Sequence, residues 1–309
     1  MVRTSGFHPV NRGSIPLWTT TLKSLNRHKT LLYAYNHHVK YLEGFSSVDY
    51  AHNTVRGYKS SLNSILRYLN GTDVKLNKLD YSFIEGYYNY LRNVENLQPN
   101  SAFKNIKNLY RVIHVAMDNK WLDSNPFKDF HCRYKNPIRP YLTESEINKL
   151  VNKAFHTDKL SRIRDLFLFQ VYTGLSYSDI MLLTKGNIEV GVDGKRWIVT
   201  TRIKTGARIS IPLLPRADAV LKRYKYCLPN YSNQKFNEYL KEIAVICKIT
   251  KKLTTHVGRH TFATTVCLSH GIPIETVSRL LGHSDIKTTQ IYAKVTDTKV
   301  ANDMRFLME

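Results

Sequence analysis

Two histidines and an arginine lie close together near the C-terminal end of the sequence, in the segment TTHVGRHTFATT. His256, Arg259 and His260 are spaced i, i+3 and i+4, so a helix that begins near Thr255 places their side chains on one face. Two imidazoles beside a guanidinium form a patch rich in hydrogen-bond donors, which suits a phosphate group. A zinc-protease helix would need glutamate directly after the first histidine. Position 257 is valine, so the pattern does not predict a metal site.

A second group of polar residues follows in the segment IPIETVSRLLGHSDIKTTQIYA. Gly282 is suited to end one helix, and Ser284 and Asp285 are suited to begin the next, so His283 is predicted in the tight turn between them. Tyr292 lies about two helical turns further on. By geometry alone the pattern also fits a DNA-reading helix-turn-helix, whose groove contacts would be Lys287, Thr288, Thr289 and Gln290.

Together these segments resemble the tyrosine recombinase, or phage integrase, family. The resemblance is carried by His256-x-x-Arg259, by the Leu-Gly-His turn that ends at His283, and by Tyr292 nine residues later. The segment TGLSYSDIMLLT resembles a further box of the family. The match covers the C-terminal half and extends more weakly over the N-terminal half. It implies a mainly α-helical fold with a small antiparallel β-sheet in the C-terminal domain, in which a helical core-binding domain precedes an α/β catalytic domain.

The resemblance also implies a role for each residue. Tyr292 would attack the scissile phosphate to form a 3′-phosphotyrosyl link, while Arg259 would bind the non-bridging oxygens. His256 and His283 would donate hydrogen bonds and move protons. The family has a lysine on a β-hairpin that protonates the leaving 5′ oxygen, and Lys204 matches it. Two further lysines compete for that role, Lys251 and Lys252. Because one phosphate ester is exchanged for another, no cofactor is implied, neither ATP nor metal.

The position of the family's first arginine is the main departure. That arginine normally follows Thr-Gly-Leu, but Thr173-Gly-Leu175 is followed by Ser176, and the next acidic residue is Asp179 where glutamate is usual. Losing one fixed donor to a transition-state oxyanion typically costs about 3–4 kcal/mol. Arg202 is the predicted replacement cation, because it lies two residues before Lys204 on a predicted strand and alternate residues share a face. The alternative is that Arg202 only grips a backbone phosphate.

The elements that would position these residues lie on either side of a basic segment with three prolines, residues 126–140. Before it, apolar residues recur every three or four positions, which predicts helices at 28–45, 53–70, 80–94 and 100–119. The residues predicted to face the core are Tyr58, Leu62, Ile65, Leu66 and Leu69 on the second helix and Ile106, Leu109, Val112, Ile113 and Met117 on the fourth. After it, Thr143-Glu-Ser-Glu146 is a capping box that opens a new helix. A three-stranded antiparallel sheet is predicted from the β-forming stretches Ile188–Val190, Trp197–Lys204 and Ala207–Ile211.

The sequence therefore predicts an N-terminal arm or remnant of an arm-binding domain, a helical core DNA-binding domain, a linker, a catalytic domain and a C-terminal tail. The predicted bounds are 1–27, 28–135, 136–142, 143–295 and 296–309. The tail ends in apolar residues and is predicted either to be exchanged between subunits or to pack on its own domain. Four basic residues are candidate DNA contacts: Lys104, Lys107, Arg111 and Lys287.

Charge and composition narrow the class of protein. The 309 residues carry a net charge of +22, with 20 basic and 9 acidic residues in 1–140 and 26 and 15 in 141–309. Equal positive charge on both halves favours a polyanion held from two sides, with charge for solubility as the alternative. Hydrophobic residues at 42% argue against wholesale disorder, and no stretch is apolar enough for a membrane span. The four cysteines form no C-x-x-C pair, which favours a reducing cytoplasm.

The predicted function is a site-specific DNA recombinase that integrates, excises or inverts a mobile DNA segment in the cytoplasm of a prokaryote. The predicted partners are duplex DNA, further copies of the chain in a homo-tetramer on two DNA sites, and optionally an accessory DNA-bending protein. No membrane partner is expected. Two alternatives share the fold: a catalytically impaired DNA-binding protein, which Ser176 favours, and a type IB topoisomerase-like enzyme. A non-enzymatic helix-turn-helix regulator would leave His256, Arg259 and Lys204 unexplained.

Overall fold

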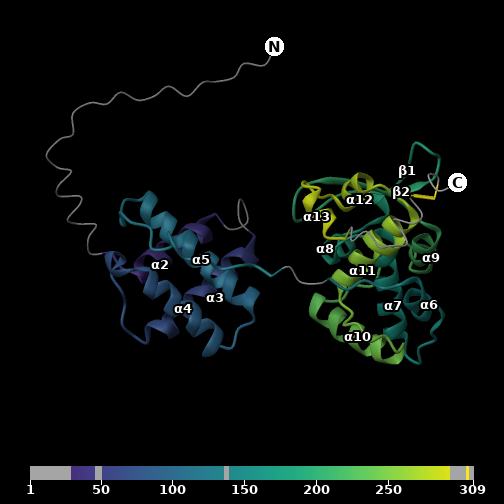
Figure 1. The fold of residues 1–309 in the computed structure, drawn as a ribbon. Helices are drawn as coiled ribbons and strands as arrows, with labels where there is room; N and C mark the ends of the chain where they lie inside the picture. The colour runs from purple at the N-terminus through teal and green to yellow at the C-terminus, as the bar shows by residue number, and fades with distance from the viewer. Residues whose placement is uncertain (1–28, 46–50, 136–138, 293–303, 306–309) are drawn as a thin grey trace, which may run out of the picture. The chain divides into compact units, whose positions relative to one another are not determined.

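The chain divides into two compact units, residues 1–136 and 137–309 (Figure 1). The computed structural model describes residues 29–45, 51–135, 139–292 and 304–305. The predicted arm (1–27) lies outside the described residues, as do residues 136–138 of the predicted linker and all of the predicted tail except Met304 and Arg305. Each unit has a hydrophobic core of its own.

Unit 1, residues 1–136, is helical throughout its described part. Its helices are α2 (Leu31–Gly44), α3 (His52–Leu69), α4 (Tyr81–Asn93) and α5 (Pro99–Asp118), with a 3-10 turn η1 (Leu76–Lys78). These bounds agree with the predicted helices to within three residues. The side chains of Thr30 and Asp80 accept hydrogen bonds from the first turns of α2 and α4, and Pro99 opens α5.

The core of unit 1 follows the predicted apolar spacing on α5 but not fully on α3. Four α5 residues are buried as predicted: Ile106, Leu109, Val112 and Ile113. On α3, Leu66 was predicted in the buried stripe but is 43% exposed. Two serines take the inner positions instead, because Ser61 bonds to the buried Tyr35 hydroxyl and Ser64 bonds to Glu95. The inner face of α3 is therefore more polar than the apolar spacing predicts.

Unit 2, residues 137–309, surrounds one buried helix. Its elements before the sheet are α6 (Glu144–Asn152), α7 (Asp158–Thr173), α8 (Tyr177–Met181) and η2 (Lys185–Asn187). After the sheet follow α9 (Pro215–Arg223), α10 (Asn233–Ile246), α11 (Thr255–Thr261), η3 (Phe262–Cys267), η4 (Leu268–His270), α12 (Ile274–Leu281) and α13 (Lys287–Gln290). Helix α7 packs against α9, α10 and α11, which is why its side chains are buried on nearly every side.

The sheet has three antiparallel strands in the order β1 (Ile188–Val190), β2 (Arg196–Thr201) and β3 (Arg208–Pro212). Ile198 pairs with Ile211 across β2 and β3, and both side chains face the core. The other face of the sheet is partly exposed, as expected for a small antiparallel sheet. Strand β2 ends three residues earlier than predicted, at Thr201.

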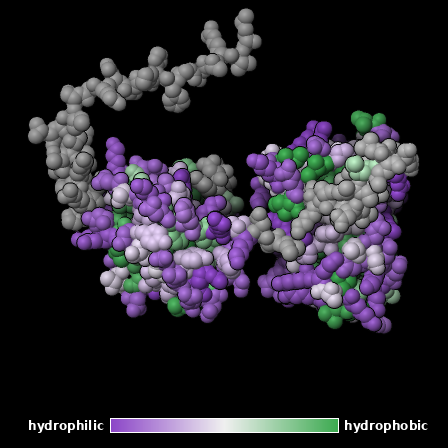
Figure 2. Space-filling view, in the orientation of Figure 1, coloured by the Kyte–Doolittle hydropathy of each residue, from purple (hydrophilic) through white to green (hydrophobic). Residues whose placement is uncertain are grey.

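Mainly hydrophilic side chains cover both units in the view of Figure 2, with hydrophobic residues in small separate areas. Within the described part of the chain, no helix is long and apolar enough to cross a membrane. The described His, Cys, Asp and Glu side chains also form no group of three or more that could hold a metal ion.

Candidate active site

Arg259 lies at the centre of a buried cluster of polar groups in unit 2. It is on α11, and its guanidinium donates from Nη1 to the carbonyl of Gly174 (2.7 Å) and from Nη2 to the carbonyl of Leu281 (2.6 Å). Nη2 is also 3.1 Å from Nε2 of His283. Gly174 ends α7 in the left-handed region, φ +66°, and a Cβ there would lie 2.3 Å from the Phe262 ring. A glycine therefore lets this carbonyl reach the arginine.

His283 follows directly on the end of α12. Gly282 has φ +63°, and a Cβ on it would lie 2.6 Å from both Cδ of Arg202 and Cγ2 of Ile209. The turn returns the backbone N–H of His283 to the Ser278 carbonyl, a glycine-dependent helix end of the predicted kind. This places the imidazole beside Arg259, as predicted for the turn between the two helices.

Arg202 enters the same cluster from the turn after β2. It is 8% exposed, its Nη1 donates to the Leu281 carbonyl (2.9 Å), and its Nε lies 3.5 Å from Oδ2 of Asp179. The Leu281 carbonyl thus accepts hydrogen bonds from Arg202 and Arg259 together. Because a carbonyl oxygen has two lone pairs, both bonds are compatible, and they hold two guanidinium groups side by side.

Asp179 connects Arg202 to Ser176, the residue at the position of the family's first arginine. Ser176 caps α8 and donates from its hydroxyl to Oδ2 of Asp179 (2.6 Å), while the backbone N–H of Ile203 donates to Oδ1 (3.1 Å). Asp179 is 4% exposed, so its carboxylate is a buried charge that needs these partners. From the sequence alone, Asp179 is visible only as a departure from the glutamate usual in the family. In the structure, Asp179 contacts both Arg202 and Ser176, so the two unusual residues are in contact with each other and, through Asp179, with the predicted replacement cation.

The geometry of Arg202 and Lys204 differs from the prediction. Both were expected on one face of a strand that reached Lys204, but β2 ends at Thr201 and the chain turns, with Gly206 N–H bonded to the Arg202 carbonyl. Neither residue lies in the strand, so the prediction that Arg202 and Lys204 share one strand face is wrong. Arg202 is buried and Lys204 is exposed on the turn.

Tyr292 is buried against two histidines. Its ring stacks on His283 with centroids 6.2 Å apart and lies 5.0 Å from the ring of His260. Its backbone N–H donates to the carbonyl of Thr289 (2.9 Å). Burial and the charge of Arg202 lower the pKa of Arg259, and the nearby Tyr292 side chain opposes part of that shift. The structure thus brings together Tyr292, Arg259 and His283 from three elements.

His256 lies at the outer edge of the cluster. It is on the first turn of α11 and is exposed, whereas Arg259 and His260 on the same helix are buried. The helix face predicted to hold all three therefore begins at the surface and continues into the interior. The rings of His256 and His260 are stacked at 6.1 Å. Burial, and then the charges of Arg259, Arg139 and Lys204, lower the pKa of His256.

The two other lysines have different partners. Lys251 forms an ion pair with Glu146 at 2.6 Å and lies over the ring of Tyr141. Lys252 is exposed between α10 and α11. The contacts of Lys251 stabilise the start of α6, so the geometry favours Lys204 of the three for chemistry beside His256.

Burial and positive charge keep the imidazoles of the cluster neutral. Burial, and then the charges of Arg259 and Arg202, lower the pKa of His283 to about 4. Burial and nearby cations likewise lower the pKa of His260 to about 4. Burial and the charge of Arg202 lower the pKa of Arg259 to about 10, which leaves it charged at neutral pH. Two adjacent cations in a poorly solvated site attract an anion such as a phosphate.

The predicted DNA contacts lie outside this cluster. On α5 of unit 1, Lys104, Lys107 and Arg111 are all exposed. Lys287 is exposed at the start of α13. The helix-turn-helix interpretation is wrong for Thr289, because α13 has four residues and Thr289 has no exposed surface. A groove-reading helix would present that side chain to solvent.

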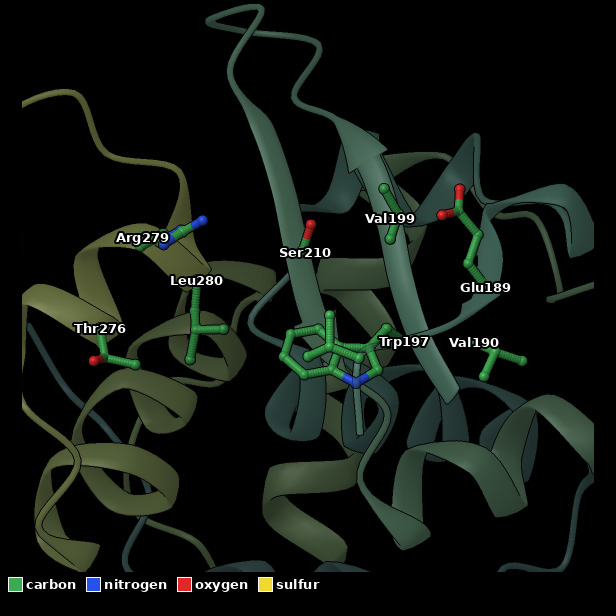
Figure 3. A pocket seen from close by; sticks show the side chains of 10 residues that line it. Glu189, Val190, Trp197, Val199, Ser210, Thr276, Arg279 and Leu280 are labelled. Carbon is green, nitrogen blue, oxygen red and sulfur yellow. The ribbon is translucent and has the colours of Figure 1, made fainter. Parts of the chain in front are cut away.

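A cavity of about 440 Å³ is lined in part by Thr276, Arg279 and Leu280 of α12. Figure 3 shows the Trp197 ring of β2 at its centre, with Thr276 and Leu280 of α12 on one side and Val190 of β1 on the other. None of the predicted catalytic residues lines it. This cavity is therefore separate from the phosphate-attracting cluster.

Family models match both units. The model of the phage integrase family matches residues 140–299, and that of the phage integrase SAM-like domain matches residues 20–135. The chain belongs to the phage integrase family. It is a tyrosine recombinase, a site-specific enzyme that cleaves and rejoins DNA strands, and the relatives favour this over the topoisomerase-like and impaired-binder alternatives.

Relatives and solved structures of integrase-family proteins agree with that placement. Tyrosine recombinase XerD of Listeria monocytogenes is 27% identical over 273 residues, covering 80% of this chain and 90% of the relative. Tyrosine recombinase XerC of Pediococcus pentosaceus is 25% identical and covers 83% and 92%. The Tn1549 transposon integrase in complex with a circular intermediate DNA has a TM-score of 0.72 at 17% identity, covering 89% of this chain and 99% of that one. A lambda integrase tetramer bound to a Holliday junction also has a TM-score of 0.72, at 19% identity, covering 90% of this chain and 82% of that one. At these identities the two structures establish the shared fold.

Proposed function

We propose that this recombinase cuts DNA by attack of the Tyr292 phenol oxygen on the scissile phosphate. The oxygen–phosphorus bond forms, the bond from phosphorus to the 5′ oxygen breaks, and the chain keeps the 3′ phosphate as a tyrosyl ester. The observation that carries this proposal is the stacking of the Tyr292 ring on His283, whose Nε2 in turn lies 3.1 Å from Nη2 of Arg259. Tyrosine is a weak nucleophile at neutral pH, so it needs neighbours that stabilise negative charge and accept its proton.

Arg259 and Arg202 would bind the non-bridging oxygens of that phosphate. Arg202 would take the place of the arginine that Ser176 lacks. Three features support this: the ion pair with Asp179, the Leu281 carbonyl shared with Arg259, and the space that Gly282 leaves for its side chain. An arginine that only grips backbone phosphate is expected on the surface, and the burial of Arg202 argues against that alternative.

Lys204 would act on the leaving group, and His256 would act on the phosphate itself. Lys204 lies on an exposed turn and can approach the 5′ oxygen, to which it would donate a proton as general acid. His256 is exposed beside it and would hold a non-bridging oxygen. His283 is engaged with Arg259 in the free protein, so an incoming phosphate would take over part of that contact.

The first test is covalent trapping of the intermediate. The protein is mixed with nicked duplexes that carry random flanking sequences, denatured in SDS and examined for a protein–DNA band of reduced mobility. We expect a band with the wild type and none with Tyr292→Phe, because the variant keeps the ring and loses the nucleophilic oxygen. Salt-sensitive DNA binding without any band, also on junction DNA of the parent element, would instead support the catalytically impaired binder.

The wider assembly is proposed from the charge and from the relatives. Both halves of the chain are equally basic, which supports unit 1 as the core DNA-binding domain and unit 2 as the catalytic domain on one duplex. The lambda integrase of known structure is a tetramer on a Holliday junction, which supports a homo-tetramer here. Exchange of the tail 296–309, an accessory DNA-bending protein, an arm function for 1–27 and a cytoplasmic location remain predictions.

Replacing Lys104, Lys107 and Arg111 together by alanine should weaken DNA binding without regard to sequence. Each lost phosphate contact lowers the slope of log affinity against log salt by about 1. The measurement is fluorescence anisotropy with a labelled duplex at several salt concentrations.

The matched control for that triple variant removes three exposed lysines of unit 1 outside α5, namely Lys75, Lys78 and Lys128. Both variants lose three charges, so a general effect of net charge changes them equally. Equal slopes for the two triple variants would show that α5 does not face the DNA.

A further inference from the structure

Thr289 connects two groups of the proposed reaction centre. It lies in α13 and has no exposed surface. Its hydroxyl oxygen is 2.8 Å from Nδ1 of His283, and its backbone carbonyl accepts the N–H of Tyr292 at 2.9 Å. A single residue therefore contacts the histidine with its side chain and the tyrosine with its backbone.

The surroundings of His283 determine which ring nitrogen carries its proton. Arg259 can only donate hydrogen bonds, so Nε2, at 3.1 Å from Nη2, must be the unprotonated nitrogen. Burial lowers the pKa of His283 to about 4, so the ring is neutral at physiological pH and its proton is on Nδ1. That N–H points at Thr289 Oγ1, which accepts it.

The Thr289 hydroxyl is not bonded in the local way found at two other buried helical threonines of the unit. Thr173 and Thr261 each donate to the carbonyl four residues earlier, Phe169 and Val257, which is the ordinary local bond of a helical threonine. Thr289 Oγ1 is instead bonded to a side chain of another turn. Its bond serves the histidine rather than its own helix.

We propose that Thr289 is a positioning residue that fixes the tautomer and orientation of His283. This deepens the proposed function and rests on it, because it assigns the state of a histidine that acts beside Tyr292 and Arg259. The hydroxyl oxygen accepts Nδ1–H whether Nε2 is bare or protonated. His283 can therefore gain or lose a proton at Nε2 without turning its ring, which keeps that nitrogen directed at Arg259 and the phosphate.

The activity test compares Thr289→Val with Thr289→Ser. Valine has nearly the same shape and lacks the hydroxyl, while serine keeps it. We expect covalent-complex formation on saturating DNA to fall by about 10- to 100-fold with valine and to stay close to the wild type with serine. The factor is the one found when a group that orients a metal-bound histidine is removed. Thr261→Val is the matched control, because it removes a buried helical hydroxyl that does not contact His283.

The spectroscopic test does not depend on catalysis. In the full chain labelled with ¹⁵N-histidine, the His283 signals are assigned by their loss in His283→Gln. We expect the wild type and Thr289→Ser to show a protonated Nδ1 and a bare Nε2 at neutral pH. Thr289→Val should show a mixture of tautomers, and Thr261→Val should match the wild type.

Either of two results would overturn the assignment: a wild-type His283 with its proton on Nε2, or valine and serine variants with the same tautomer and the same rate. Absence of a Tyr292-dependent adduct in the wild type would refute the proposed function instead. The nitrogen spectra would still decide whether Thr289 sets the state of His283.

Discussion

Arg202→Ala should form the covalent protein–DNA complex about 100- to 1,000-fold more slowly than the wild type on saturating nicked DNA. That factor is typical for loss of one preorganised donor to a transition-state oxyanion. The loss is expected in the rate and much less in DNA affinity, because Arg202 is buried beside Arg259 rather than exposed on a DNA-facing surface. The measurement is a single-turnover time course of the SDS-resistant band.

Three further variants make the result for Arg202 interpretable. Arg208→Ala removes an exposed arginine on the neighbouring strand and should cleave at the wild-type rate. Arg202→Lys keeps a charge near the buried Asp179, so it tests the fork geometry of the guanidinium without leaving that carboxylate unpaired. If Arg202→Ala cleaves as fast as the wild type while Arg259→Ala is inactive, Arg202 is not the replacement cation.

Gly282→Ala should damage both stability and cleavage. The left-handed conformation, φ +63°, costs an alanine about 1–2 kcal/mol. The added Cβ would lie 2.6 Å from Cδ of Arg202 and Cγ2 of the buried Ile209, and such overpacking costs about 1–3 kcal/mol more. Because Arg202 is one of the two side chains that must move, we also expect a cleavage rate below the wild type. Denaturant unfolding and the adduct time course measure the two effects.

Gly194→Ala separates the conformational cost from the contact. Gly194 lies in the β1–β2 turn with φ +69°, close to that of Gly282, and a Cβ there meets nothing within 4 Å. It should lose only the conformational part of the stability and keep the wild-type cleavage rate. Equal losses for the two variants would mean that the space beside Arg202 has no role.

Local patterns predicted most of the elements, because they depend on neighbours in the sequence. The spacing of apolar residues located α5, and the Gly282 turn located His283 between two helices, where the structure has it. The same reasoning failed where a distant contact decides the result. Leu66 is exposed because serines of α3 occupy the inner positions and bond to Tyr35 and Glu95. Strand β2 stops at Thr201 because the chain turns at Arg202, whose side chain reaches Asp179.

The hydrogen bonds within this cluster could not be predicted from the sequence for the same reason. The contact of Arg202 with Leu281 spans 79 residues, and that of Ile203 with Asp179 spans 24. The shared acceptor is a main-chain carbonyl, which every residue has, so no residue type in the sequence indicates it. Ser176 and Asp179, which depart from the residues usual in the family, are the sequence features that indicate a different arrangement of charges here.

The C-terminal end of α12 has a consequence for how this centre can be switched. The Leu281 carbonyl at this end accepts hydrogen bonds from Arg202 and Arg259, and His283 follows two residues later. Helix α13 packs on α12 and is followed closely by Tyr292. A rigid shift of this one short helix would displace both cations, the histidine and the nucleophile at the same moment. The positions of these groups therefore depend together on the position of α12. Helix α12 also lines the cavity beside Trp197 (Figure 3). A ligand in the cavity would contact the same helix without entering the cluster.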